Sequence, residues 1–154
     1  MNQKEKLKLF WKITDLINKT YCSGKLAIKD IRFFNDPKRF GYDHYKIHKD
    51  SRGRVIGYPC KGHYDLKRNI IFILDNKKDL NTTCSIAHII NFLHELAHAQ
   101  QIQLRGQHYQ KKFANHKHIS KKTYHRIMHD YEWDKICKDY WTIFDKHASI
   151  GVKR

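Results

Sequence analysis

The sequence predicts an α+β domain in which a small antiparallel sheet packs on a central buried helix, with further helices after it. Three observations predict this class: a nearly unbroken apolar helical stretch after Cys84, short β-branched runs before it, and helically spaced apolar residues towards both ends. The chain has 154 residues, of which 40% are apolar and 13% aromatic. This is enough for one core, so we expect a single domain over residues 1–154.

The first predicted element is an amphipathic helix from Asn2 to about Thr20, because apolar residues recur there at helical spacing with lysines between them. The following stretch, Tyr21 to Asp50, is rich in turn-forming residues. Its best strand candidate is Lys25–Phe34.

Two β-branched runs, Arg54–Pro59 and Asn69–Leu74, are predicted to be adjacent antiparallel strands. The polar segment between them contains Gly62 and Tyr64. Together the two strands would form the small sheet.

The central helix is predicted to begin at Cys84, after a polar run that offers several N-cap residues. We expect it to end near residues 104–105, because Gly106 is a good C-cap residue. A new element would then start over 109–116, and further helices would follow from about Lys121.

The chain is strongly basic, with 31 Lys and Arg against 15 Asp and Glu and a net charge of +16. Residues 1–60 carry 14 basic and 6 acidic side chains (+8), residues 61–107 carry 6 and 4 (+2), and residues 108–154 carry 11 and 5 (+6). The basic flanks could bind DNA or RNA through phosphates. Lysine-rich solvated surfaces and an acidic membrane are the alternatives that charge leaves open.

No apolar run approaches the roughly 20 residues of a membrane-spanning helix, and no secretory signal is visible. The four cysteines form no C-x-x-C pair, so we expect small buried hydrophobes rather than disulfides or a zinc ribbon. We therefore expect a soluble cytoplasmic protein with no membrane partner. Its small size and Lys-, Asn-, Ile- and Tyr-rich composition would suit a bacteriophage or another compact genome.

The central helix contains the motif HELAH, from His94 to His98. Histidines at i and i+4 lie on one helix face, so both imidazoles can bind one Zn²⁺. Glu95 is placed to accept a proton from a zinc-bound water. The chain has only three glutamates, and composition alone predicts roughly 0.02 such motifs. The sequence therefore predicts a catalytic zinc site rather than two incidental core histidines.

A catalytic zinc needs a third protein ligand and an open position. We favour His108, which follows Gly106 at the expected turn, where the chain could fold back over the metal. Glu132 is the acidic alternative on a later helix, and His116 and His118 are weaker candidates in a polar run.

Three segments resemble the SprT-like (Spartan-type) zinc metalloproteases: GHYDLKRNIIFIL (62–74), HELAHAQ (94–100) and GQHYQKKF (106–113). The resemblance implies a zincin-like fold with a β-hairpin, an HExxH helix and a third histidine near an H-G-x-x-F segment. In the family that histidine usually lies four residues before the Phe, where this chain has Tyr109. Many relatives carry a C-terminal zinc ribbon, for which no cysteine pair is present after residue 98. Relatives cleave proteins bound to or crosslinked with DNA.

The leading hypothesis is a zinc-dependent endopeptidase that acts on proteins associated with nucleic acid. His94, His98 and His108 would hold Zn²⁺, and Glu95 would be the general base. Tyr109 and His63 are candidates for a donor to the oxyanion, and the sequence selects neither. One alternative is a nucleic-acid-binding accessory protein with a structural or vestigial HExxH zinc. The other is a regulatory protease resembling the ImmA type, with an acidic third ligand.

Overall fold

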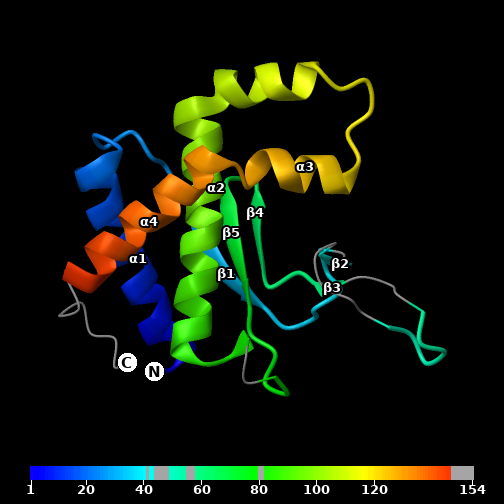
Figure 1. The fold of residues 1–154 in the computed structure, drawn as a ribbon. Coiled ribbons are helices and arrows are strands. Elements are labelled where there is room, and N and C mark those ends of the chain that lie inside the picture. The colour runs from blue at the N-terminus through cyan, green and yellow to red at the C-terminus, as the bar shows by residue number, and fades with distance from the viewer. Residues whose placement is uncertain (41, 44–48, 55–57, 80–81, 147–154) are drawn as a thin grey trace.

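The computed structural model describes residues 1–40, 42–43, 49–54, 58–79 and 82–146, and confirms the α+β class. Figure 1 shows the long helix α2 with the sheet on one side of it and α4 crossing it. The elements are α1 (Gln3–Tyr21), β1 (Asp30–Phe34), β2 (Tyr42–Asp43), β3 (Tyr58–Pro59), β4 (Gly62–Asp65), β5 (Ile70–Leu74), α2 (Ser85–Ala114), α3 (Lys121–Met128) and α4 (Tyr131–Lys146).

The main sheet has the order β1-β5-β4 and is mixed rather than antiparallel. β4 and β5 form an antiparallel hairpin, in which Gly62 pairs with Ile73. β1 runs parallel to β5, and Asp30 pairs with Ile70. The long connection between β1 and β5 lets the chain return to the same end of the sheet, as parallel pairing requires.

The predicted pairing of Arg54–Pro59 with Asn69–Leu74 is wrong, because β3 pairs with β2 and β5 pairs with β4. Residues 55–57 of that predicted strand lie outside the described residues. The polar segment forms β4 because a short turn closes the hairpin: Arg68 N donates to Asp65 Oδ1 (3.0 Å). Asn69 completes the turn in the left-handed region, at φ 57°.

Only the second half of the predicted strand Lys25–Phe34 is a strand, β1. The chain before it is fixed to α1 instead. The oxygen and the nitrogen of the Asn18 side-chain amide both bind the Leu26 backbone. Leu26 N donates to Asn18 Oδ1 (2.9 Å), and Asn18 Nδ2 donates to Leu26 O (2.9 Å). Side-chain pairing of this kind competes with a regular strand ladder.

The core lies between the sheet and the helices α1 and α2. All five residues of β5 are buried. Ile71 and Ile73 belong to the cluster formed with α1 and α2, where the rings of Phe10 and Phe92 stack with centroids 4.5 Å apart. The first half of α2 packs against β5, and α2 also contacts β4, the neighbouring strand. Residues on this half of α2 therefore lie beside β4.

α2 is longer than predicted and is bent at Arg105, where the backbone is non-helical (φ −127°, ψ 25°). Figure 1 shows the second half turning at the upper end of the helix and running above α3. The expected stop at Gly106 is therefore a bend, and Gly106 is not among the residues with positive φ. The second half is fixed by a small core in which Tyr109 packs with Ile127 and Met128 of α3.

Candidate metal centre

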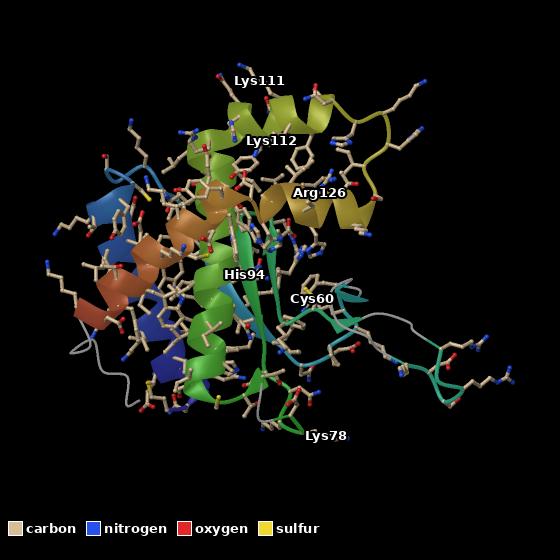
Figure 2. The ribbon with its side chains drawn as sticks, in the orientation of Figure 1. Cys60, Lys78, His94, Lys111, Lys112 and Arg126 are labelled. Atoms are coloured by element: carbon tan, nitrogen blue, oxygen red, sulfur yellow. The ribbon has the colours of Figure 1, made fainter. Side chains whose placement is uncertain are left out.

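Three histidines from two parts of the chain bring their Nε2 atoms together. His94 and His98 lie one turn apart on α2, with Nε2 atoms 3.1 Å from each other. His129 directly follows α3, and its Nε2 lies 3.0 Å from that of His94 and 3.2 Å from that of His98. Figure 2 shows where His94 lies on α2. Among the described residues these three form the group that could hold a metal ion.

The spacing fits a metal ion, since zinc–nitrogen bonds of roughly 2.0–2.1 Å in tetrahedral geometry separate ligand nitrogens by about 3.3 Å. The hydrogen bonds of the Nδ1 atoms also fit. His98 Nδ1 donates to Gln101 Oε1 (2.7 Å), and His129 Nδ1 donates to His125 O (2.6 Å). In neutral rings these bonds place the proton on Nδ1 and direct the Nε2 lone pairs of both residues at the common centre.

Such lone pairs repel one another unless a cation lies between them. A proton is disfavoured there, because burial and the neighbouring His94 and His129 lower the pKa of His98 well below its usual value. The donor set of three neutral imidazoles suits zinc and other divalent transition metals. The residues present therefore fit a bound metal.

Glu95 lies beside this group, mostly buried, against the backbone of β4. A Cβ placed on Gly62 would lie 2.9 Å from Glu95 Cγ and 3.0 Å from Glu95 Oε1. The missing side chain of Gly62 thus makes the space that the Glu95 carboxylate occupies.

A cavity of about 710 Å³ opens over the three histidines and Glu95. Its walls include β4 on one side and α3 on the other. His63 and Tyr124 both line it, and burial lowers the pKa of His63. Partial desolvation of its hydroxyl and the nearby charge of Glu95 raise the pKa of Tyr124, although the residue is exposed overall, so the hydroxyl stays protonated and able to donate.

Tyr109, the other expected oxyanion donor, does not line this cavity. It is 2% exposed, and its hydroxyl is engaged with Gln101 and Asp130.

The structure does not bring His108, the expected third ligand, to His94 and His98, and His129 lies beside them instead. The reason is that the chain continues as a helix beyond Arg105 instead of folding back over the metal. His108 Nε2 lies 3.7 Å from Glu132 Oε2. Glu132, the alternative ligand, accepts from Arg105 Nη2 (2.7 Å) and also lies outside the group.

The candidates His116 and His118 lie in the link between α2 and α3, and neither joins the three histidines. His129 is a site residue that the sequence patterns do not identify, because it follows His98 by 31 residues in a segment whose clearest pattern is apolar helical spacing. The pair His129-Asp130 at the break between two helical patterns was its one local signal.

Comparison of the chain with protein-family models, with curated proteins and with solved structures found no match. The resemblance to SprT-like metalloproteases therefore remains a prediction from its motifs. Among the described residues, no helix is both long enough and apolar enough to cross a membrane.

Proposed function

We propose that the chain is a zinc-dependent endopeptidase. The observation that supports this most directly is the convergence of three imidazole Nε2 atoms, within 3.0–3.2 Å of one another, in residues that line one cavity together with Glu95. Three protein ligands with access to a cavity are typical of catalytic rather than structural zinc, which prefers four closed ligands and usually cysteines.

Each residue of the site would have a distinct role in peptide hydrolysis. His94, His98 and His129 would hold the metal. Zinc bound there would act as a Lewis acid and lower the pKa of a coordinated water toward about 7. Glu95, held against Gly62, would accept the proton of the attacking water and later pass it to the leaving amine. The Tyr124 hydroxyl on the cavity wall is a candidate donor to the peptide carbonyl oxygen.

The cavity suits an extended peptide. β4 is an edge strand of the three-stranded sheet, and residues 62–64 line the cavity. An edge strand offers backbone donors and acceptors to a peptide added alongside it. Ile90, Ile119 and Tyr124 also line the cavity and are 46%, 43% and 45% exposed, so they could receive apolar side chains of the substrate.

The test of this proposal is Glu95→Gln, which keeps the shape of the side chain and removes the base. We expect cleavage of an unfolded protein substrate to fall by about 10²- to 10⁴-fold, with zinc content unchanged. Glu132→Gln is the matched control, because Glu132 binds Arg105 away from the metal-ligating group. Equal cleavage by Glu95→Gln and the wild-type chain would contradict the proposed role of Glu95.

For the substrate we propose proteins held on nucleic acid, on the basis of one segment. Residues 106–129 contain six Lys and Arg and no Asp or Glu. Lys111, Lys117, Lys122 and Arg126 are exposed there. Figure 2 shows Lys111 at the bent end of α2 and Arg126 on α3. Residues of this segment, among them Ile119 and Tyr124, also line the cavity.

This part is tested by replacing Lys117, Lys122 and Arg126 together by Glu and measuring DNA affinity against salt. We expect weaker binding and a shallower log–log salt slope, by about 0.7–0.9 for each phosphate that the variant no longer neutralises. Replacing Lys4, Lys8 and Lys12, exposed on α1, by Glu makes the same charge change elsewhere. Equal effects of the two triple variants would leave a general peptidase as the better account. DNA binding by a zinc-loaded wild type without proteolysis would favour the accessory protein.

A further inference from the structure

A chain of hydrogen bonds with the buried Gln101 at its centre starts at His98, on the ring nitrogen that faces away from His94 and His129. Gln101, which is 0% exposed, accepts from His98 Nδ1 (2.7 Å). Its Nε2 donates to Tyr109 Oη (2.7 Å) and to Met128 O (2.9 Å). Because two acceptors hold the nitrogen end of this amide, the oxygen end is fixed toward His98.

The chain continues to the residue that follows His129. Tyr109 Oη donates to Asp130 Oδ1 (3.0 Å). The same carboxylate accepts from Trp133 N (3.0 Å) and from Lys112 Nζ (2.5 Å). Asp130 therefore connects the second half of α2, through Tyr109 and Lys112, to the backbone at the start of α4.

The bend at Arg105 makes this connection possible. In a straight helix Tyr109 would lie about 12 Å along the axis from Gln101. The bend turns the second half of α2 back over α3, where Tyr109 packs with Met128 and reaches the Gln101 amide. The second half of α2 is thereby joined to the turn that carries His129.

We infer that Gln101, Tyr109 and Asp130 are positioning residues for the metal centre. Gln101 fixes the Nδ1–H form and the ring orientation of His98. Tyr109 and Asp130 hold the turn between α3 and α4 so that His129 Nε2 meets the other two nitrogens. This inference rests on the metal site of the proposed function but not on the proteolysis.

The experiment measures zinc affinity by competition with a chromophoric chelator, and the visible spectrum of the cobalt-loaded chain, in the full-length protein. Gln101→Leu should weaken zinc binding by about 10- to 100-fold and change the cobalt spectrum. Gln103→Leu is the matched control. Gln103 is on the same helix and binds Ala27, Tyr64 and Asn69 rather than a histidine, so its variant should bind zinc like the wild type.

Two further variants separate positioning from folding. Gln101→Glu keeps an acceptor for His98 Nδ1–H and should bind zinc more tightly than Gln101→Leu, even though both lose the bonds to Tyr109 and Met128. Tyr109→Phe keeps the buried ring and removes the hydroxyl, and it should weaken zinc binding by about 10-fold, the lower end of the range for supporting partners.

The outcomes are distinct. Equal zinc affinity of Gln101→Leu, Tyr109→Phe and Gln103→Leu would overturn the positioning role and leave the proposed protease intact. A wild-type chain that binds zinc and cleaves no protein would contradict the protease while the variant series still supports the positioning. A wild-type chain that binds no zinc would overturn both.

Discussion

The second half of α2 and the turn between α3 and α4 can be compared, because each could have supplied the third histidine of the site. Each follows the HELAH motif, and each carries a histidine close to a change of chain direction, His108 in the first and His129 in the second. The helical half supplies Tyr109 and Lys112, which hydrogen-bond Asp130, and the turn supplies the third nitrogen of the group that could hold a metal ion. The third histidine of such a group therefore need not be the nearest one downstream, because packing decides which ring faces the other two.

The largest expected effect separates these two histidines. His129→Ala removes one of three converging nitrogens, so its zinc affinity should fall by more than the roughly 10–100-fold typical of removing a supporting partner. His108→Ala should leave zinc affinity unchanged, because His108 lies beside Glu132 outside the group. Chelator competition on the two variants in parallel makes the measurement.

The reverse result, with zinc lost from His108→Ala and retained in His129→Ala, would restore the ligand that the sequence favoured. It would also show that the second half of α2 folds over the metal rather than over α3.

A smaller effect is expected from glycine substitutions in the hairpin and at the bend. Gly62→Ala places a methyl group 2.9 Å from Glu95 Cγ and 3.0 Å from Glu95 Oε1, so the Glu95 side chain must shift. Displacing the base should lower proteolysis by on the order of 10- to 100-fold, while zinc affinity and melting temperature stay close to those of the wild type. Protease assays and thermal unfolding monitored by circular dichroism check both statements.

Gly106→Ala is the control for that substitution, since nothing lies within 4 Å of a Cβ at Gly106. We expect unchanged proteolysis and a gain of up to about 1 kcal/mol from helix propensity, which corresponds to roughly 2–4 °C in melting temperature. A strong loss of stability would show instead that Gly106 needs a conformation that only glycine adopts.

Much of the fold was predictable because it follows from local patterns. The apolar spacing of residues 2–20 and the capping box of Asn2 and Glu5 define α1, and the buried stretch after Cys84 defines the first half of α2. The pairing of the strands was harder to predict from the sequence. β4 has only four residues, and its partner was decided by the turn from Asp65 to Asn69 rather than by β-propensity.

The site divides in the same way. The spacing of His94 and His98 is a property of one helix and can be read from sequence. His129 and Gly62 reach the site through tertiary packing: α3 docks on α2, and the hairpin edge lies beside Glu95. Gln101 is the i+3 neighbour of His98 on α2, but its bonds to Tyr109 and Met128 depend on the bend at Arg105. These tertiary contacts join residues that are not related by a helical or strand repeat, so no periodic pattern in the sequence predicts them.

X-ray absorption at the zinc edge, on the full chain loaded with one equivalent of metal, tests directly whether His94, His98 and His129 hold one zinc. We expect three imidazole nitrogens and one further light atom at about 2.0 Å, and only two imidazoles in His129→Ala. Sulfur in the zinc shell, or three imidazoles retained in His129→Ala, would contradict this expectation.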